Sequence, residues 1–404
     1  MKTRRRVLLV INTLGRAGAE TALMQLLKRL RDDQWDVSLF VLLGQGEMVK
    51  ELPEHVKLLN RTYDDTPVLT DEGKQHLKRH LMQLLLNRGN VLRQAIPVAV
   101  NAVQMLRGGR GLMLDKLLWR AASDGAQRID EHFDLAIAYL EGGSAYYVAD
   151  HVKADRKVGF IHIDYSHAGY TRRMDHDCYV GFDRIFPVSD EVRTAFLKVY
   201  PECADRTEVF HNLVDQSSIR ERAKEPGGFD DGYDGTRILT VGRLTEQKAY
   251  EISISAMRLL RDHGRRVRWY VLGEGDQRQK LEAQIRQLRL EQDFVLMGAK
   301  PNPFPYYAQT DLYVHASRFE GKSIAIQEAM TLGKPVIVSD CSGNREQVVP
   351  DVNGLMCDLT PESVCRAVEE LLDDPVRARR LGCAAAQVDL TDEDSMWKIN
   401  KLFD

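Results

Sequence analysis

The sequence predicts an α/β protein made of two doubly wound domains that face each other across a cleft. In both halves of the chain, continuous apolar runs alternate with amphipathic helical segments, as in parallel sheets covered by helices on both faces. Between the halves, residues 216–235 contain Pro226-Gly227-Gly228 and several acids, which is typical of a connector. Two α/β halves of similar size favour a ligand site between them.

The first half opens with an apolar run, Val7 to Ile11, which we expect to be a buried strand. A glycine-containing loop follows and ends at Gly18, and leucines at helical spacing come next. A strand, loop and helix in this order let a ligand approach the backbone near Gly18. The alternative, that the glycines only allow the helix to pack, stays open.

A histidine near the end of a later strand is a second candidate in the first half. The run Lys157 to Asp164 is expected to be a strand, and His162 lies near its C-terminal end. Ligands of open parallel sheets bind at those ends. We therefore take His162 as a site residue, with a purely structural role as the alternative.

Residues 61–130 interrupt the alternation of strands and helices. Leucines recur there at helical spacing among many lysines and arginines, so we expect a helical insertion. A basic amphipathic segment can lie on an anionic membrane surface. The alternative is a set of helices packed on the domain with the basic face in water.

These patterns divide the chain. We expect a first domain over 1–215 with the insertion, a connector over 216–235, a second domain over 236–388 and a C-terminal helix over 389–404. The last strands of the first domain are expected at residues 184–189 and 208–212.

One stretch of the second half combines an anion seat with two acids. A strand-like run, Asp311 to Ser317, leads to a loop with Glu320, and a helix follows with Glu328 about one turn inside it. The loop amides from Lys322 to Ala325 would be the unpaired donors of a helix N-terminus, which attracts phosphate. The stretch therefore suits the binding of a molecule with a sugar, a diphosphate and a ribose. The alternative is that the two acids are ordinary surface residues with no ligand.

The first loop of the second half places two cations after a strand. Arg243 and Lys248 are five residues apart in Val241 to Lys248, just before a helix. Each charge-assisted hydrogen bond from such a group to a phosphate is worth about 1.5–3 kcal/mol. A solvated charged loop is the alternative.

Three motifs in order resemble the family-4 retaining glycosyltransferases of the GT-B fold, which has two Rossmann-like domains. The motifs are Val241 to Lys248, Val271 to Asp276 and Glu320 to Asp340. The resemblance covers most of residues 236–375 and is looser in the first half. Residues 61–130 match nothing in it.

The resemblance implies a role for each motif residue. Arg243 and Lys248 would bind the donor diphosphate, Glu320 would contact the transferred sugar, and Glu328 would hold the ribose hydroxyls. His162 matches a histidine near the sugar. The implied catalytic residues are Glu320, His162, Lys248 and Arg243, and the implied donor-binding residues are Gly18, Arg243, Lys248, Gly273, Gly321, Lys322, Ser323, Ile324 and Glu328.

Two residues depart from the family pattern. Ala249 stands where a glycine usually follows the lysine, and Lys322 occupies a position that is usually apolar or small, which bears on the sugar that fits. The strings Asp175-His176-Asp177 and Asp392-Glu393-Asp394 match the metal-binding D-x-D pattern but follow no buried strand. We expect no metal and no cofactor, because the cations and the helix end supply the positive charge.

Bulk properties exclude other classes. The net charge of −3 over 404 residues argues against nucleic acid as a partner, and the six cysteines form no C-x-x-C pair that would indicate a zinc site.

We expect a cytoplasmic protein, with the basic helical region as a candidate contact to the inner membrane face. The expected function is sugar transfer from a UDP- or GDP-linked donor to a lipid-linked or glycan acceptor in cell-surface polysaccharide synthesis. The alternatives are a nucleotide-sugar epimerase or hydrolase, and a non-catalytic nucleotide-sugar-binding scaffold.

Overall fold

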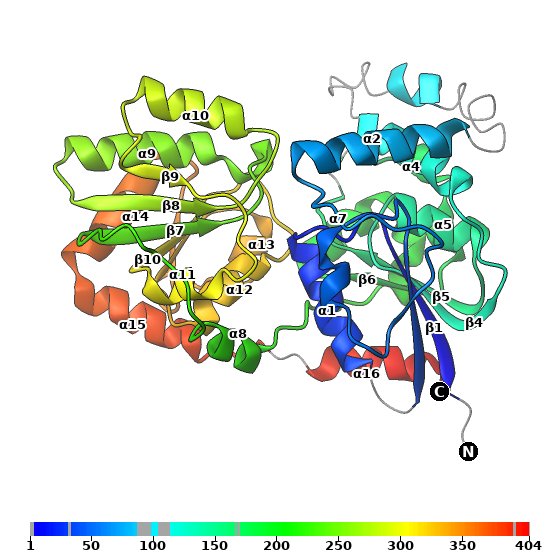
Figure 1. Ribbon diagram of the computed structural model, residues 1–404. Coiled ribbons are helices and arrows are strands. Elements are labelled where there is room, and N and C mark those ends of the chain that lie inside the picture. The colour runs from blue at the N-terminus through cyan, green and yellow to red at the C-terminus, as the bar shows by residue number, and fades with distance from the viewer. Residues whose placement is uncertain are drawn as a thin grey trace. The chain divides into compact units, whose positions relative to one another are not determined.

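The computed structural model describes residues 4–30, 34–86, 98–103, 114–165, 168, 170–390 and 393–403. The chain forms two compact units, each described here by itself. Unit 1 contains residues 1–212 and 393–404, and unit 2 contains residues 213–392. Each unit holds one six-stranded sheet with helices on both faces, as Figure 1 shows. The predicted α/β architecture with two doubly wound sheets is confirmed.

Unit 1 has the strand order β3-β2-β1-β4-β5-β6, and all of its strand pairs are parallel. The strands are β1 (Arg5–Ile11), β2 (Trp35–Val41), β3 (Lys57–Leu58), β4 (His132–Ala138), β5 (Lys153–Ile161) and β6 (Arg184–Pro187). The α-helices are α1 (Gly18–Arg29), α2 (Asp71–Leu86), α4 (Leu114–Gly125), α5 (Gly143–His151), α6 (Arg172–Asp175), α7 (Asp190–Val199) and α16 (Glu393–Asn400). Short 3-10 helices are η1 (Glu47–Glu51), η3 (Cys178–Gly181), η4 (Pro201–Arg206) and η6 (Lys401–Phe403).

The central strand β1 shows why the sequence reads as an unbroken apolar run. Residues 7–11 are all fully buried, because β2 and β4 pair with the two edges of β1 and helices cover both faces. Leu8 and Val10 point to one face, where they pack with Phe40 and Tyr147. A parallel strand buried on both faces needs apolar side chains at every position.

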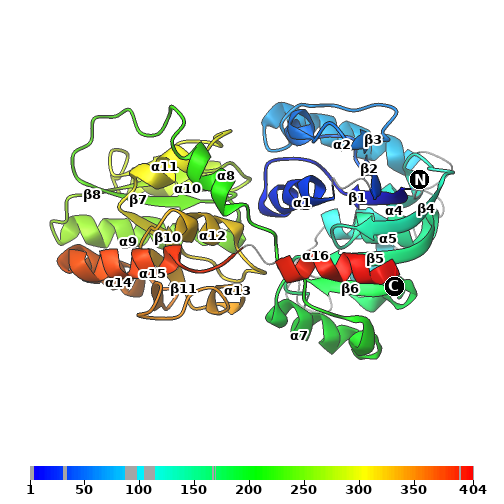
Figure 2. The same ribbon diagram turned by 90° about the horizontal axis from the view of Figure 1, so that it is seen from below.

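The C-terminal helix α16 packs on unit 1, beside strands made at the start of the chain. Figure 2 shows it in red with the sheet of this unit. The ring of Phe403 lies edge-on to Trp35, with centroids 5.6 Å apart, and the guanidinium of Arg5 lies 4.1 Å from the Phe403 centroid. Residues 393–404 are therefore part of the first unit, although they follow the second in sequence.

The segment expected as a helical insertion holds two long helices in its described part. Helix α2 packs on α4 through Leu84 and Ala122, whereas Met82 and Leu86 of α2 are exposed. Residues 87–97 and 104–113 lie outside the described residues. None of the helices in the described part of the chain combines the length and the apolar character needed to span a bilayer.

Unit 2 has the strand order β12-β11-β10-β7-β8-β9, which read backwards is the doubly wound order of unit 1. The strands are β7 (Thr236–Val241), β8 (Val267–Leu272), β9 (Phe294–Leu296), β10 (Leu312–His315), β11 (Val336–Ser339) and β12 (Leu355–Cys357). The helices are α8 (Gln216–Arg222), the 3-10 helix η5 (Glu246–Lys248), α9 (Tyr250–Asp262), α10 (Arg278–Gln287), α11 (Phe304–Gln309), α12 (Ile324–Thr331), α13 (Ser342–Arg345), α14 (Pro361–Asp373) and α15 (Pro375–Ala386).

Alternate residues of each strand in unit 2 enter two different cores. Ile238 of β7 packs with side chains of α9, α10 and α14, and its neighbour Leu239 packs with side chains of α8, α11 and α12. Val314 and Tyr313 of β10 divide in the same way. The two layers clamp the sheet, so the loops at its C-terminal edge start from fixed strand ends.

Two segments differ from the sequence-based expectation. Residues 216–235 begin with helix α8, because the Asp215 carboxylate accepts a hydrogen bond from the Ser218 amide at 2.9 Å and Ile219 is buried in the core of unit 2. Residues 208–212, expected as a strand, form none. The amides of Glu208 and Phe210 donate to Ile185 and Pro187 at 3.0 and 2.9 Å, but no ladder extends beyond these contacts.

The placement of α16 predicts which of its side chains stabilises the protein. Ile399 is fully buried, whereas Trp397 on the same helix is 55% exposed. Ile399→Ala should lower the free energy of unfolding by about 2–4 kcal/mol, because a cavity replaces packed methyl groups. Trp397→Ala should change it by no more than about 0.5 kcal/mol. Urea unfolding of both variants measures this, and equal effects would contradict the assignment of α16 to a packed core.

Candidate nucleotide-sugar site

The strand order of unit 2 reverses between β7 and β10, and ligands of doubly wound sheets bind at such a switch point. The loop after β7 and the loop after β10 are joined there. The Arg318 amide donates to the Gln247 carbonyl at 2.8 Å, and the Gln247 side-chain amide donates to the Phe319 carbonyl at 2.8 Å. The two motifs singled out in the sequence therefore lie side by side.

Glycines let neighbouring loops touch through their backbones. A Cβ on Gly273, whose φ is +156°, would lie 1.9 Å from the Gly242 carbonyl oxygen. A Cβ on Gly343 would lie 1.9 Å from the Gly321 carbonyl oxygen. Any side chain at Gly273 or Gly343 would push a site loop away. Gly273 thus supports the cation loop through contact, which gives it a structural role beside the implied donor contact.

Lys248 and Glu320 form an ion pair at this edge of the sheet. The Lys248 ammonium lies 2.6 Å from Glu320 Oε1, and both side chains are largely buried. His315, the last residue of β10, contacts both: its Nε2 lies 2.9 Å from Glu320 Oε1 and 3.2 Å from Lys248 Nζ. Ser323 Oγ is 3.4 Å from the same nitrogen. Three of the predicted site residues, Lys248, Glu320 and Ser323, therefore meet around one histidine.

The electrostatics of this cluster favour one charge state. Burial raises the pKa of Glu320, but the Lys248 ammonium and the His315 hydrogen bond outweigh burial and hold that pKa well below its ordinary range. Burial and the Lys248 charge lower the pKa of His315, which the Glu320 hydrogen bond only partly offsets. The cluster at neutral pH is therefore a carboxylate, an ammonium and a neutral imidazole.

Helix α12 directs its N-terminus toward this loop region. It begins after Ser323, whose side chain makes no capping hydrogen bond, and ends at Thr331, two residues before Gly333, which has a φ of +66°. The expected helix after the Glu320 loop is confirmed. An uncapped helix N-terminus carries partial positive charge and exposed amide donors, and both favour a phosphate.

Glu328 lies one turn inside α12 and is buried. Its Oε2 is 3.0 Å from the Tyr307 hydroxyl. Burial raises the pKa of Glu328 to about 7, although the Tyr307 hydrogen bond and the Arg222 charge act in the opposite direction. The carboxyl group thus changes charge near neutral pH, which suits a group that exchanges its partners when a ligand arrives.

The remaining residues of the expected donor site lie on the same loops. Arg243 is exposed in the loop after β7, and Lys322 is partly exposed beside Gly321. Ala249, where the family usually has glycine, adopts the left-handed conformation with a φ of +45°. A glycine is preferred there because the β-carbon of alanine costs energy in this conformation. Ile324 is the first residue of α12.

Unit 1 has its own polar cluster at the switch point between β1 and β4. The His162 amide donates to Glu141 Oε2 at 3.0 Å. The Asn12 side chain donates to the Glu141 carbonyl at 3.3 Å and accepts from the Ser144 amide at 2.7 Å. Asn12, Glu141 and His162 follow β1, β4 and β5, so this edge of the sheet gathers them as the strand order dictates.

The imidazole of His162 is neutral and has a free nitrogen. Burial lowers the pKa of His162 to about 3 and holds that of Glu141 above its ordinary value. Within the described residues, His162 Nε2 is buried and has no hydrogen-bond partner. A buried polar atom without a partner is costly, so this nitrogen is available to a ligand hydroxyl. Gly18 begins α1 in the same unit, and a Cβ there would meet no atom within 4 Å.

The first D-x-D string has a structural role at its first residue. Asp175 is fully buried and accepts hydrogen bonds from the hydroxyls of Tyr146, Tyr165 and Tyr200 at 2.7, 2.6 and 2.9 Å. In the second string, Asp392 lies outside the described residues.

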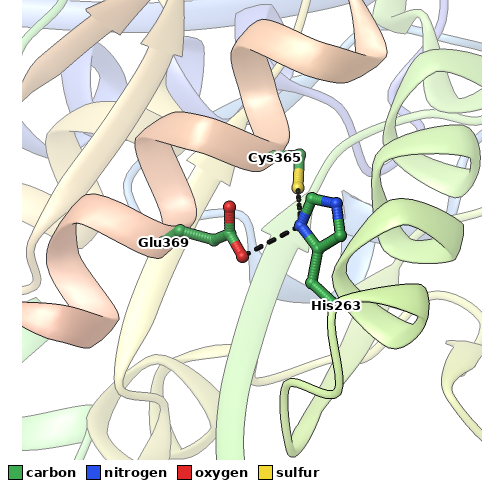
Figure 3. A group of neighbouring side chains, drawn as sticks. All are labelled: His263, Cys365 and Glu369. Atoms are coloured by element: carbon green, nitrogen blue, oxygen red, sulfur yellow. Dashed lines mark hydrogen bonds and ion pairs between the residues drawn. The ribbon is translucent and has the colours of Figure 1, made fainter.

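A second cluster with ligand-type side chains joins α9 and α14 in unit 2 (Figure 3). His263 Nδ1 lies 3.1 Å from Glu369 Oε1 and 3.9 Å from Cys365 Sγ. Arg265 also donates to Glu369 Oε1, at 2.9 Å, and burial raises the pKa of Cys365 to about 11. A bound guanidinium and a protonated thiol oppose a cation, so the cluster is an ion-pair network that joins two helices.

Comparison with solved structures identifies the fold. HepE of Anabaena, solved in complex with UDP and glucose, superimposes with a TM-score of 0.70 and 17% sequence identity, over 99% of each chain. At this identity the likeness shows the fold, and that fold is GT-B. The family model described as glycosyl transferases group 1 matches residues 222–388. This matched part of the chain is similar to that family, and it contains both Lys248 and Glu320.

Two curated relatives extend the comparison. An N-acetylgalactosaminyltransferase of Campylobacter jejuni that acts on a diphospho-undecaprenol-linked disaccharide is 30% identical over 198 residues, which are 48% of this chain and 52% of the relative. The amylovoran biosynthesis glycosyltransferase AmsK of Erwinia amylovora is 33% identical over 144 residues, 34% of this chain and 35% of the relative. The chain thus matches about a third to a half of the length of these relatives.

Sequence reasoning missed several residues of these clusters, among them His315, Tyr307 and Glu141. His315 and Tyr307 belong to unit 2, and Glu141 belongs to unit 1. The signal for His315 is a polar residue inside the buried run Leu312–His315. Tyr307 gave no signal, because a tyrosine on a short helix is usually a core residue.

The raised pKa of Glu328 predicts a pH-dependent stability. Between the ordinary value of 4.5 and about 7, the native protein keeps a proton that the unfolded chain has lost, so the free energy of unfolding falls as pH rises. The loss should reach about 3 kcal/mol by pH 8 as an upper bound. Glu328→Gln should not show this fall in the free energy of unfolding, and it should be more stable than the wild type at pH 8. Urea unfolding of both proteins across this pH range measures the difference.

The exposed Glu362→Gln on α14 is the control for this measurement. It should keep the pH dependence of the wild type. An unchanged pH dependence in Glu328→Gln would contradict the assignment of the titration to Glu328.

Proposed function

We propose that this protein is a retaining glycosyltransferase that moves a sugar from a nucleoside diphosphate donor to a lipid-linked or glycan acceptor. The observation that carries the proposal is the Lys248–Glu320 pair at the switch point of unit 2, beside the uncapped N-terminus of α12. This cation, acid and helix end lie within the segment that matches the glycosyl transferases group 1 family.

Each part of the donor is matched by one group of unit 2. Lys248, Arg243 and the amides from Gly321 to Ile324 would bind the diphosphate, and Glu328 would bind the ribose hydroxyls. Glu320 would accept a hydrogen bond from a hydroxyl of the transferred sugar. The complex of HepE with UDP favours a uridine donor over a guanosine donor.

The chemistry follows from the charges. The bond between the sugar C1 and the donor phosphate oxygen breaks, and negative charge grows on the leaving diphosphate. Lys248, Arg243 and the α12 amides would stabilise that charge. The acceptor oxygen attacks C1 on the face that the phosphate leaves, its proton passes to a phosphate oxygen, and the sugar keeps its anomeric configuration.

We assign acceptor binding to unit 1. His162 Nε2 offers a neutral, buried nitrogen for an acceptor or sugar hydroxyl. The relative from Campylobacter jejuni acts on a diphospho-undecaprenol-linked sugar, and AmsK acts in amylovoran biosynthesis. These relatives support a lipid-linked acceptor in polysaccharide synthesis.

A protein that acts on a lipid-linked acceptor must reach a membrane surface, and helix α2 has exposed residues suited to contact with one. Met82 and Leu86 are 56% and 67% exposed and lie one turn apart. Lys78 and Arg79, also exposed, lie on the preceding turn. Exposed apolar residues flanked by basic ones suit the boundary of an anionic bilayer. We propose that α2 contacts the cytoplasmic face of the inner membrane.

The donor assignment predicts binding and turnover. Among UDP-, GDP- and ADP-sugars, one UDP-sugar should raise the melting temperature and release UDP in the presence of acceptor. Arg243→Gln should lower kcat/KM for this donor about 10- to 100-fold, because one charge-assisted bond to phosphate is lost. Lys248→Met should lower it more. Arg379→Gln, which removes an exposed arginine on α15, is the control and should not change it.

The products separate the alternatives. Free sugar or an epimerised donor without acceptor would indicate a hydrolase or epimerase, and binding without any turnover would indicate a scaffold. Absence of binding by every donor would contradict the site itself.

The membrane assignment predicts binding to anionic vesicles. The wild type should float with vesicles of phosphatidylglycerol and phosphatidylcholine, and the double variant Met82→Ser, Leu86→Ser should float less, because apolar contact with the lipid is lost. Val376→Ser, which removes a 71% exposed apolar residue on α15, should float like the wild type. Equal flotation of all three proteins would argue against α2.

A further inference from the structure

We propose that His315 is a positioning residue for sugar transfer, which keeps the Glu320 carboxylate in place and ionised while Lys248 binds the donor diphosphate. The inference rests on the proposed function of unit 2 and adds a residue that the sequence motifs do not contain. His315 is the last residue of β10, on one side of the switch point.

The geometry places one ring nitrogen among all the polar groups of the cluster. His315 is 1% exposed, and its Nε2 lies 2.9 Å from Glu320 Oε1, 3.2 Å from Lys248 Nζ and 3.4 Å from Ser323 Oγ. The other nitrogen, Nδ1, lies 3.0 Å from the Tyr313 hydroxyl. Both ring nitrogens therefore have partners, and the ring cannot turn without losing them.

One tautomer of the neutral ring supports Glu320 in both stages of donor binding. With the proton on Nε2, the ring donates to Glu320 and accepts the Tyr313 O–H at Nδ1. The opposite tautomer directs the Nε2 lone pair at Lys248 and gives Glu320 nothing. When the diphosphate attracts Lys248, only the first tautomer leaves Glu320 with a hydrogen bond.

The hydrogen bond from His315 matters because it helps Glu320 to stay ionised. A buried carboxylate that loses its cation binds a proton unless another donor stabilises the charge. A protonated Glu320 could no longer accept the hydrogen bond of a sugar hydroxyl without first reorienting. His315 supplies a donor that does not compete for the diphosphate, because its ring is held between Glu320 and Tyr313.

The charged and titratable groups around His315 come from several elements. Lys248 belongs to η5, Glu320 to the loop before α12, and Tyr313 to β10. Tyr250 of α9 and Cys341 after β11 interact with the charge of Glu320. Burial raises the pKa of both of these groups, so they stay neutral and leave Lys248 and His315 as the partners of Glu320.

Two variants of His315 separate positioning from mere packing. In His315→Gln the side-chain amide nitrogen can occupy the place of Nε2 and donate to Glu320. In His315→Asn the shorter amide reaches only the place of Nδ1. Both variants remain polar and similar in size, so a shared loss of folding would affect both alike. Ser317→Ala, at another fully buried polar residue of the loop after β10, is the control.

We expect His315→Gln to keep kcat/KM within about fivefold of the wild type and His315→Asn to lose at least about 50-fold, chiefly in kcat. The acidic limb of the pH profile of kcat/KM should move up by at least one pH unit in His315→Asn and stay in place in His315→Gln and Ser317→Ala. This shift reports the protonation of Glu320, which a loss of stability would not move. Equal losses in both variants, or an unmoved acidic limb in His315→Asn, would overturn the proposal.

UDP binding by calorimetry between pH 5 and 8 distinguishes this inference from the proposed function. If the wild type binds UDP but transfers no sugar, the proposed function is wrong. The inference is then decided by the same titration with the UDP-sugar, whose additional affinity over UDP would come from the contact between Glu320 and the sugar. That additional affinity should be lost at a higher pH in His315→Asn alone. If the wild type does not bind UDP, both are wrong.

Discussion

The buried ion pair between Lys248 and Glu320 is the interaction on which the site of unit 2 depends. Removing two charges from water is costly, and their attraction repays that cost only when the geometry is good and further hydrogen bonds complete it. Here the loops after β7 and β10 are tied through their backbones, and His315 contacts both partners. Such a pair adds little net stability. Its role is better explained as a pair of charges held ready for a ligand, because the Lys248 ammonium can leave Glu320 and bind an incoming diphosphate.

The overall fold could be read from the sequence because its cause is local. A strand buried on both faces must be apolar throughout, and this run alternates with amphipathic helices in both halves. The connector was only partly predictable. Asp215 caps α8, and the tertiary contacts of Ile219 then hold a short helix where the Pro and Gly content suggested a loop. The edge segment after η4 likewise reads as a strand but lacks a ladder of its own.

The site could be predicted only for residues whose type and local sequence pattern indicate their chemistry. Lys248 and Glu320 carry charges beside glycine-containing turns, so the motifs reveal them. Their contact is a product of topology, because β7 and β10 are adjacent in the sheet but distant in sequence. The residues that sequence reasoning missed, His315, Tyr307 and Glu141, have roles that exist only through such contacts. A histidine in a buried strand is the one local sign that His315 has partners.

The site also works against the stability of the unit that contains it. Glu328 is buried with Tyr307 as its hydrogen-bond partner, and its ionised form is disfavoured. Ala249 holds a left-handed backbone that glycine adopts more easily. Neither feature helps the fold, and both lie next to the residues that would bind the donor. Strain and unfavourable burial of this kind are expected where a protein must bind a charged ligand.

Helix α16 has a consequence for the way the chain is made. Unit 2 is an insert within unit 1, and its two ends are joined where Gln216 bonds to Val388 and Leu390. During synthesis the inserted unit can fold as soon as residue 392 has emerged. Unit 1, however, must wait for residues 393–404, which follow unit 2 in sequence, before its own core is complete. A donor-domain exchange between related proteins would therefore have to replace residues 213–392 as an internal cassette with two junctions, since a single crossover would separate the first unit from its final helix.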